Sequence, residues 1–425
     1  MMKKICVIGL GYIGLPTSVM FANNGFEVHG VDVNDSVIDS LSKGEVHIIE
    51  PGLKELLNSA IEKQTFTVSK TPTEADIYII AVPSPINEDK TANLRYVEEA
   101  TKSIVPVVQK GNLVILESTV PPRTVEDVMI PILEETGLAI GDELYISHSP
   151  ERVIPGKVFT ELVENDRIVG GINSVSSDMT VELYETFVKG KIHITDATTA
   201  ELVKVIENTY RDINIAFANE LAKISDQIGV NVWEAINFAN FHPRVNIHLP
   251  GPGVGGHCIA VDPWFLVEKQ PDLANIIHLA RNTNDSMPSY TAERAKLILE
   301  NNGTPEGKVA VLGLAFKANI DDMRESPSME VIKHLRTQGV HFTAYDPHAS
   351  KIEFEEQTDS FEEAAADADL LLILTDHQVF KELDLKALRK QVSSPVVFDT
   401  KNCIDRVKWE ENEFKVYKLG DSKNI

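Results

Sequence analysis

Cysteine is scarce in this sequence. Among 425 residues there are three cysteines, Cys6, Cys258 and Cys403, and they lie far apart. An odd number of cysteines at such wide spacing provides neither a disulfide framework nor the paired spacing of a metal site. We therefore expect no metal and a reducing, cytoplasmic environment.

Long apolar runs and an excess of positive charge are also missing. No apolar run approaches the roughly 20 residues that a membrane-spanning helix needs. The first residues, MMKKICVIGL, lead into glycines and not into a small-residue cleavage site, so they do not predict an export signal. Asp and Glu total 64 against 40 Lys and Arg, and the net charge of −24 disfavours nucleic acid and anionic membranes as partners. We expect a soluble protein with no membrane insertion, in which any anionic ligand is bound by a local site.

Two series of apolar segments are present, one at each end of the chain. In both series helical stretches separate the apolar segments, which is typical of a parallel sheet with helices on both faces. Between the series, residues 198–228 show helical periodicity without proline. The predicted fold is therefore α/β, with two doubly wound Rossmann-like domains joined by a long central helix, and with domain ranges 1–196, 197–300 and 301–425. The segments are KICVIGLG, FEVHGVDVN, DIYIIAVPSP and GNLVILEST, and then, from near residue 305, GKVAVLGLAFK, GVHFTAYDPH, ADLLLILTDH and PVVFDTKN.

The first apolar segment runs into a glycine fingerprint. GxGxxG after a strand and before a helix is the pattern of a dinucleotide pyrophosphate site, and the alternative, a glycine turn without a ligand, does not explain this context. A carboxylate after the second strand would accept hydrogen bonds from ribose hydroxyls and repel a ribose phosphate, which favours NAD over NADP. The predicted cofactor residues are Gly9, Gly11 and Gly14, Tyr12 and Ile13 within the turn, the acidic Asp32, and the loop hydroxyls Ser84 and Thr119. The second series keeps only Gly313 of this fingerprint, which leaves room for a mononucleotide.

The stretch GVGGHCIAVD places Cys258 in a glycine-rich loop, four residues before Asp262. Glycines allow the backbone to approach a ligand closely and do not build a packed core. A buried structural role, as we expect for Cys6 in its apolar strand, is the alternative for any single cysteine. In this loop we expect Cys258 to be a nucleophile and Asp262 to assist proton transfer.

Lys204, Asn208 and Arg211 project from one face of the predicted central helix, at spacings of four and three residues. Spacing alone fits a solvated polar face. The neighbouring apolar residues indicate instead that the helix is buried between two lobes; they are Ile213, Ile215, Ala216 and Phe217. A buried cationic stripe requires an anionic partner.

These segments together resemble the UDP-glucose/GDP-mannose dehydrogenase family over nearly the whole chain. The resemblance rests on GLGYIGLP, SPER, ELVKVIENTYRDINIAFANE, GGHC and FKANIDDMRESP, which occur in the family's order. The UDP-glucose branch usually has Pro-Lys before the loop aspartate, where this chain has Ala260 and Val261. With HPRVN and PGPGVGGHCIAVDPWFL, the chain is most similar to the branch that oxidises UDP-N-acetyl-D-mannosamine.

The resemblance implies a four-electron oxidation of a sugar primary alcohol to a carboxylate with NAD, through a thiohemiacetal and a thioester on Cys258. It implies an NAD-binding domain, a central helical dimerisation domain and a UDP-sugar-binding domain, a homodimer, and a role in cell-surface polysaccharide synthesis. The implied catalytic residues are Cys258, Lys204, Asn208, Asp262 and Glu151, with Thr119 near the reacting centre and Arg324 reaching the cofactor. The implied residues for the UDP-N-acetylhexosamine are Lys204, Asn208, Arg152, Val153, Arg211, His242, Arg244, Gly255, Phe316, Lys317 and Lys401.

Three other functions compete with this interpretation. The same chemistry on UDP-N-acetylglucosamine differs only in the sugar epimer. A non-catalytic NAD-binding sensor or an NAD-dependent sugar epimerase would share the glycine fingerprint, but neither requires the thiol at Cys258.

Overall fold

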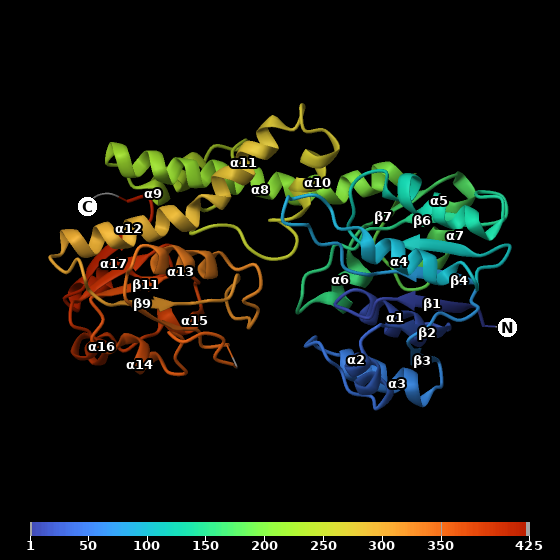
Figure 1. Ribbon diagram of the computed structural model, residues 1–425, viewed down its shortest axis with the longest axis horizontal. Helices are drawn as coiled ribbons and strands as arrows, with labels where there is room; N and C mark the ends of the chain where they lie inside the picture. Colours follow the sequence, from blue (N-terminus) through green and yellow to red (C-terminus); the bar gives the residue numbers. More distant parts are fainter. Residues whose placement is uncertain (1, 350, 422–425) are drawn as a thin grey trace. The chain divides into compact units, whose positions relative to one another are not determined.

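The computed structural model describes residues 2–349 and 351–421. The chain forms two compact units (Figure 1): Met1–Glu207 with Trp264–Pro271, and Asn208–Pro263 with Asp272–Ile425. Each unit contains one sheet and its own helices, as the predicted α/β fold requires. None of the described helices combines the length and the apolar character needed to cross a membrane.

The first unit is built on an eight-stranded sheet in the order β3-β2-β1-β4-β5-β6-β7-β8. Its first six positions follow the Rossmann strand order, in which the direction of winding reverses between β1 and β4. The four strands expected from the apolar segments are present as β1, β2, β4 and β5, whereas β3, β6, β7 and β8 were not predicted, and β7 pairs antiparallel with β6. The strands are β1 (Lys4–Ile8), β2 (Glu27–Val31), β3 (Phe66–Ser69), β4 (Ile77–Ile80), β5 (Leu113–Leu116), β6 (Tyr145–His148), β7 (Arg167–Gly171) and β8 (Ile192–Asp196).

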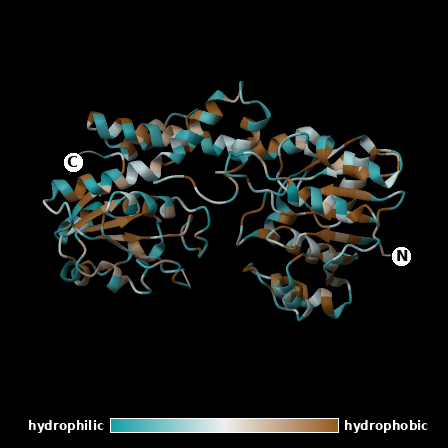
Figure 2. Ribbon diagram, in the orientation of Figure 1, coloured by the Kyte–Doolittle hydropathy of each residue, from teal (hydrophilic) through white to brown (hydrophobic). Residues whose placement is uncertain are grey.

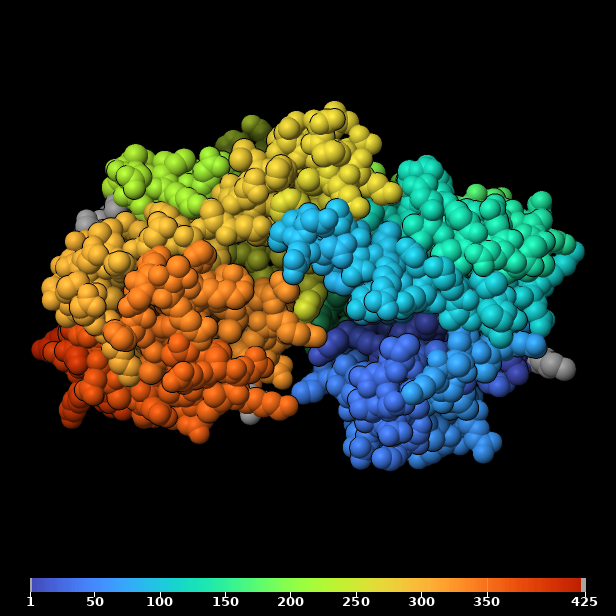
Figure 3. All heavy atoms as spheres, in the orientation of Figure 1, coloured from blue at the N-terminus to red at the C-terminus, as the bar shows by residue number. Residues whose placement is uncertain are grey.

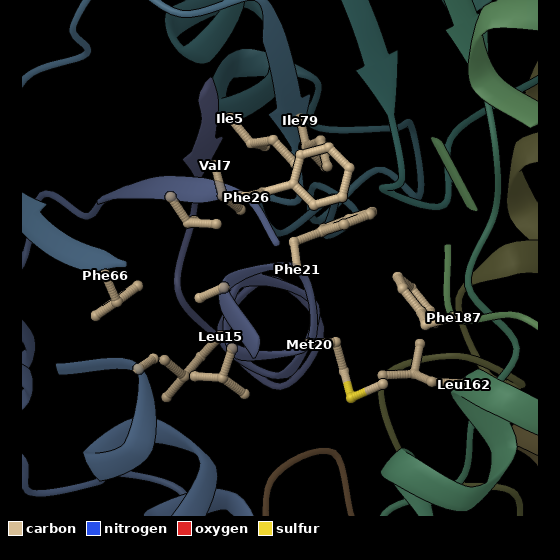
Figure 4. Close-up of a cluster of buried hydrophobic side chains, with 14 of the residues drawn as sticks. Ile5, Val7, Leu15, Met20, Phe21, Phe26, Phe66, Ile79, Leu162 and Phe187 are labelled. Carbon is tan, nitrogen blue, oxygen red and sulfur yellow. The ribbon is translucent and has the colours of Figure 1, made fainter. Parts of the chain in front are cut away.

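Strand β1 shows why the central strands of this sheet are apolar on both faces. Ile5 and Val7 belong to one hydrophobic cluster, and Cys6 and Ile8 to another. Figure 4 shows Ile5 and Val7 in the first cluster, around the helix that follows the strand. Burial raises the pKa of the Cys6 thiol to about 11, in keeping with the expected structural role. The helices of this unit are α1 (Gly14–Asn23), α2 (Asp35–Ser42), α3 (Leu53–Glu62), α4 (Arg95–Ile104), the π-helix η1 (Val125–Met129), α5 (Ile130–Leu133), the 3-10 turn η2 (Glu134–Thr136), α6 (Val158–Glu164) and α7 (Ser174–Tyr184).

The second unit contains a five-stranded parallel sheet in the order β10-β9-β11-β12-β13. This is the other common doubly wound order, and its winding reverses between β9 and β11. The second apolar series therefore forms strands as predicted, and β13 is an additional one. The strands are β9 (Val309–Leu312), β10 (Phe342–Tyr345), β11 (Leu370–Ile373), β12 (Val396–Asp399) and β13 (Lys415–Lys418).

Helices and loops cover the strands of this second sheet, which are brown in Figure 2 and hidden in the space-filling view of Figure 3. Separate hydrophobic clusters lie on its two faces, one with Val309 and Val311, the other with Ala310 and Leu312. The helices of this sheet domain are α12 (Met287–Asn301), α13 (Pro327–Thr337), α14 (Phe361–Ala365), α15 (Gln378–Lys381), α16 (Leu385–Gln391) and α17 (Arg406–Glu411).

The long helix expected at residues 198–228 is α8 (Ala197–Ile228), with 32 residues. Its first part, to Glu207, belongs to the first unit and the remainder to the second. The expectation that this helix is buried holds for only part of its surface in the single chain: Ala216 is buried, but Phe217 is 51% exposed and Arg211 is exposed. The remaining helices are α9 (Val232–Ala239), α10 (Asp262–Lys269) and α11 (Asn275–Asp285).

Candidate active site

The glycine turn between β1 and α1 contains two glycines that the fold itself requires. Gly9 has a φ of +92°, and a Cβ there would lie 2.6 Å from the carbonyl oxygen of Ala81. A Cβ on Gly14 would lie 1.8 Å from the carbonyl oxygen of Gly9. Gly11 differs, because a Cβ there would meet no heavy atom within 4 Å and its φ is not in the left-handed region. The fold therefore does not require glycine at this position, and the absence of a side chain fits the close approach of a ligand.

Asp32 follows β2 directly and is held beside the glycine turn. Its carboxylate accepts hydrogen bonds from the backbone amides of Leu10 (3.1 Å) and Asn34 (2.9 Å). A carboxylate offers about four lone-pair positions, so acceptor capacity for ribose hydroxyls remains. With Ile13 at the N-cap of α1 and no side chain capping that helix, the residues present fit the dinucleotide site predicted from the sequence.

Ser84 and Thr119 follow β4 and β5, and the structure brings them together. The hydroxyl of Ser84 donates a hydrogen bond to the carbonyl oxygen of Thr119. The carboxyl ends of β1 and β4 flank the point at which the winding of the sheet reverses, which is where ligands bind in this architecture. The segment of Thr119 is also fixed from α8, because the buried Glu201 accepts hydrogen bonds from the amides of Arg123 (2.5 Å) and Val125 (2.8 Å).

Substituting Gly11 by alanine is expected to weaken NAD binding at least about tenfold, because the new methyl group fills the space left for the pyrophosphate. The free energy of unfolding should change by less than about 1 kcal/mol, since the methyl group meets no protein atom. Calorimetric titration with NAD and thermal unfolding test both statements. Unchanged NAD affinity, or a loss of stability matching the loss of binding, would contradict this account of Gly11.

Glu151 is almost fully buried in the segment after β6, and its carboxylate has a fixed partner. It lies 2.5 Å from the guanidinium group of Arg167, at the start of β7, and accepts a hydrogen bond from the amide of Arg152 (2.6 Å). Arg167 also lies 3.7 Å from Glu117 and stacks over the ring of Tyr184 at 4.0 Å. This arrangement holds Glu151 in a single orientation.

The acidic Glu117 beside this pair has a strongly perturbed pKa. Burial raises the pKa of Glu117 to about 7 although the charge of Arg167 opposes the shift. Of the two carboxylates near Arg167, Glu151 makes the closer contact, and we assign it as the ion-pair partner. Neither Glu117 nor Arg167 was singled out from the sequence.

The side chains of Arg152 and Val153 point to different surroundings. The guanidinium group of Arg152 lies 2.7 Å from Glu207 and also donates to the carbonyl oxygen of Asp166. Val153 packs against the hydrophobic cluster of the first sheet. Arg152, which was predicted to contact the substrate, is thus paired with protein groups in this structure.

Cys258 is exposed and stands at the start of the turn that leads into α10. The amides of Val261 and Asp262 both donate to the carbonyl oxygen of Cys258, at 3.0 and 2.9 Å. This turn brings the side chain of Asp262, which is only 3% exposed, to Asn208 of α8. The amide nitrogen of Asn208 donates to the Asp262 carboxylate at 2.5 Å, and Arg211 donates to the amide oxygen of Asn208.

Three of the residues predicted on or near the central helix thus form a connected group, Arg211, Asn208 and Asp262. Lys204 lies on α8 one helical turn before Asn208 and projects from the same face. The aspartate is buried against a hydrogen-bond donor and follows the thiol by four residues.

The glycines before the thiol pack against the segment that follows β9. A Cβ on Gly255 would lie 2.5 Å from Pro327 and 3.0 Å from Cβ of Phe316, so no larger residue fits there. The amide of Gly256 donates to the carbonyl oxygen of Glu325 (3.3 Å), and the ring of Phe316 covers Gly256. The structure therefore brings the predicted residues Gly255 and Phe316 together.

Other predicted residues of the second unit surround this contact. The ammonium group of Lys401 lies 3.4 Å from the Cβ position of Gly251, and Lys317 is exposed next to Phe316. Arg324 makes a two-pronged contact with Asp322, whose pKa is lowered chiefly by that hydrogen bond. His257 also lies 3.6 Å from Asp322, which gives the residue beside the thiol a defined neighbour.

His242 and Arg244 lie in an exposed stretch after α9, where the amide of Arg244 donates to Nδ1 of His242 (3.3 Å). Asn231 is the N-cap of α9, and its side chain accepts from the amides of Trp233 and Glu234. Ser326 likewise caps α13, with Pro327 in its first turn, so Arg324 lies just before a helix N-terminus.

Comparisons with known proteins give a consistent result. Three domains of the UDP-glucose/GDP-mannose dehydrogenase family match: the NAD binding domain over residues 3–188, the central domain over 198–286 and the UDP binding domain over 310–406. A UDP-N-acetyl-D-mannosamine dehydrogenase from Methanococcus maripaludis strain C7 is 49% identical over 426 residues, which cover 99% of this chain and 97% of the relative.

Two solved structures of similarly named proteins superpose over the whole chain. The UDP-D-ManNAc dehydrogenase from Pyrococcus horikoshii has a TM-score of 0.91 at 39% identity, and the match covers 99% of this chain and 100% of that one. The UDP-N-acetyl-mannosamine dehydrogenase Cap5O from S. aureus has a TM-score of 0.90 at 43% identity, with 99% of both chains covered.

Proposed function

Because the chain belongs to the UDP-glucose/GDP-mannose dehydrogenase family, we propose that it oxidises UDP-N-acetyl-D-mannosamine to the corresponding uronate, with NAD as oxidant. The full-length similarity to proteins of that named activity is the observation that carries the proposal. Ala260 and Val261, in place of the Pro-Lys usual in the UDP-glucose branch, support the same assignment.

The first unit supplies the cofactor site. The residues that would hold NAD are Gly9, Gly11, Tyr12, Ile13, Gly14, Asp32, Ser84 and Thr119, with Arg324 completing the set. When bound, NAD accepts one hydride in each of two oxidation steps.

The thiol of Cys258 explains how a single site completes both oxidations. The first oxidation removes a hydride and a proton from the primary alcohol and leaves an aldehyde. The sulfur of Cys258 bonds to the aldehyde carbon while the carbonyl oxygen takes up a proton, which gives a thiohemiacetal. Loss of a second hydride from that carbon, and of the hydroxyl proton, leaves a thioester. Water then adds to the thioester carbon and the carbon–sulfur bond breaks, which releases the carboxylate and restores the thiol.

Each proposed catalytic side chain has one task in this sequence. Asp262, held by Asn208, moves protons to and from the oxygen of the reacting carbon and the attacking water. Lys204 donates to that oxygen as negative charge develops on it, with the amide of Asn208 assisting. Glu151, oriented by Arg167, helps to position the water. The net reaction converts the alcohol, water and two NAD into the carboxylate, two NADH and three protons.

The binding of the sugar nucleotide is the next part of the proposal. The second sheet provides a site at the carboxyl ends of β9 and β11, within the range that matches the UDP binding domain. We propose NAD binding by residues 1–196, dimerisation by 197–300 and UDP-sugar binding by 301–425. The substrate contacts are assigned to Lys204, Asn208, Arg152, Val153, Arg211, His242, Arg244, Gly255, Phe316, Lys317 and Lys401.

A homodimer formed through α8 is also part of the proposal. Large apolar side chains recur on this helix at spacings of four or seven residues and are each 45% to 56% exposed: Ile206, Tyr210, Phe217 and Ile224. An exposed apolar row of this kind is stabilised when a second helix covers it. A molar mass of one chain by light scattering at micromolar concentration would contradict the dimer.

The test of the proposed function is a comparison of substrates. We expect kcat/KM for UDP-N-acetyl-D-mannosamine to exceed that for UDP-N-acetylglucosamine and UDP-glucose by at least about tenfold, as NADH formation reports. A preference for UDP-N-acetylglucosamine would assign the epimer instead, and NAD binding without turnover of any of the three would indicate a sensor. Location in the cytoplasm and supply of cell-surface polysaccharide precursors complete the proposal.

A further inference from the structure

A buried aspartate and histidine lie beneath the loop that follows β9. Asp346 is 4% exposed, at the end of β10, and His377 is fully buried just after β11. Nε2 of His377 lies 2.9 Å from the carboxylate of Asp346. The same carboxylate accepts hydrogen bonds from the amides of Leu314 (2.7 Å) and Ala315 (2.9 Å), at the start of the loop.

His377 holds the other end of the loop. The amide of Asn319 donates a hydrogen bond to its Nδ1 at 2.9 Å. An amide can donate only to a ring nitrogen that carries no proton, so the proton of the ring lies on Nε2 and is donated to Asp346. Burial by itself would raise the pKa of Asp346, but the hydrogen bonds from His377 and from the backbone amides outweigh it and lower that pKa to about 2.

A third buried side chain also holds the start of the same loop. The hydroxyl of Thr375 donates to the carbonyl oxygen of Ala315 at 2.7 Å. A Cβ on Gly313, whose φ is +92°, would lie 2.6 Å from Cβ of Thr375. Only glycine therefore lets the backbone at residue 313 come this close to Thr375, which follows β11. Residues 314–319 are thus fastened at both ends by side chains that follow β10 and β11, the two strands that flank β9.

This loop carries side chains that face the thiol segment. Phe316 covers Gly255 and Gly256, two to three residues before Cys258, and Lys317 is exposed next to it. All of these residues belong to the second unit. A displacement of the loop would therefore move Phe316 and remove the support of the glycines that precede the thiol.

We infer that His377 and Asp346 are positioning residues for the sugar-nucleotide site, and that they act by holding the loop 314–319 so that Phe316 and Lys317 are presented to the ligand. The inference rests on the proposed function for the identity of that ligand. Two hydrogen bonds fasten Asn319, at the end of the loop that follows Lys317: its amide donates to Nδ1 of His377, and its side-chain oxygen accepts from the amide of Gln378 at 3.0 Å.

Two conservative variants separate the two hydrogen bonds of His377. In His377→Asn the side-chain oxygen stands near the position of Nδ1 and still accepts from Asn319. In His377→Gln the amide nitrogen reaches toward Asp346, and the acceptor for Asn319 is lost. His377→Phe keeps the ring volume and loses both, and His341→Phe alters an exposed histidine of the same domain as the control.

The measurements are hydrogen exchange of peptides covering residues 310–322, the affinity for UDP, and KM for each substrate. We expect faster exchange in His377→Gln and His377→Phe, with UDP affinity about tenfold weaker, KM for the sugar nucleotide raised similarly and KM for NAD within about twofold of wild type. His377→Asn should stay within about threefold of wild type in every measurement, which a purely structural role for the ring would not predict.

The inference would be overturned if His377→Asn and His377→Gln, at matched thermal stability, showed the same hydrogen exchange and the same UDP affinity. Faster exchange without weaker UDP binding would also overturn it. Failure of wild type to oxidise UDP-N-acetyl-D-mannosamine would instead reject the proposed function. In that case hydrogen exchange still shows whether His377 holds the loop.

Discussion

Replacing Cys258 by serine is expected to lower kcat for the complete oxidation by at least about 10³-fold. A thiol with an ordinary pKa of about 8.5 is partly ionised near neutral pH, whereas a serine hydroxyl without an adjacent base is not. The variant should retain its affinity for NAD, because Cys258 is not among the residues assigned to the cofactor. Steady-state NADH formation and calorimetric titration with NAD measure the two quantities.

Cys403→Ser provides the matched control for this experiment. Cys403 is the other cysteine of the second unit, and burial together with the nearby Asp399 raises the pKa of its thiol well above the usual range. We expect this variant to keep kcat within about twofold of wild type. Activity of Cys258→Ser within tenfold of wild type would contradict covalent catalysis by Cys258.

Replacing Asp262 by asparagine is expected to lower kcat by about 10² to 10⁴-fold, the usual contribution of a positioned acid or base. The change removes the proton acceptor but keeps an oxygen that can accept the hydrogen bond from Asn208, so the fold should be retained. Kinetics at saturating sugar nucleotide and NAD measure the effect, with thermal unfolding as the check on the fold.

Asp272→Asn makes the same chemical change at an exposed position and should leave kcat within about twofold of wild type. If Asp262→Asn is equally active, proton transfer must be assigned to another group. Glu151, which Arg167 holds in a fixed orientation, would be the next to test.

Much of the fold could be predicted from the sequence because its signals are local. The apolar segments, the glycine turn and the proline-free stretch of α8 each determine structure within a few neighbouring residues, and each prediction is confirmed. The antiparallel pairing of β7 with β6 was not predicted, because strand direction depends on connections that periodicity does not reveal. The caps at Asn231 and Ser326 were recognisable for the same local reason.

The supporting side chains of the site could not be found in this way. Arg167 lies 16 residues beyond Glu151 in the sequence, and His377 is 31 residues from Asp346 and 58 from Asn319. Glu151 and Arg167 meet because β7 runs antiparallel to β6, so that the start of β7 lies beside the end of β6. Asp346 and His377 meet because β10 and β11 flank β9 and all three strands end at the same edge of a parallel sheet. The exposure of α8 could not be predicted either: Ala216 is buried and the adjacent Phe217 is exposed. Composition does not reveal which face of a helix packs against the rest of the same chain.

The central claim is that one site carries out both oxidations while the sugar is bound to Cys258, and counting NADH tests it most directly. With excess NAD and a limiting, known amount of UDP-N-acetyl-D-mannosamine, the account predicts two NADH for each sugar nucleotide consumed by wild type, with no aldehyde trapped by an added hydrazine. One NADH for each sugar nucleotide, or free aldehyde captured in proportion to turnover, would contradict it.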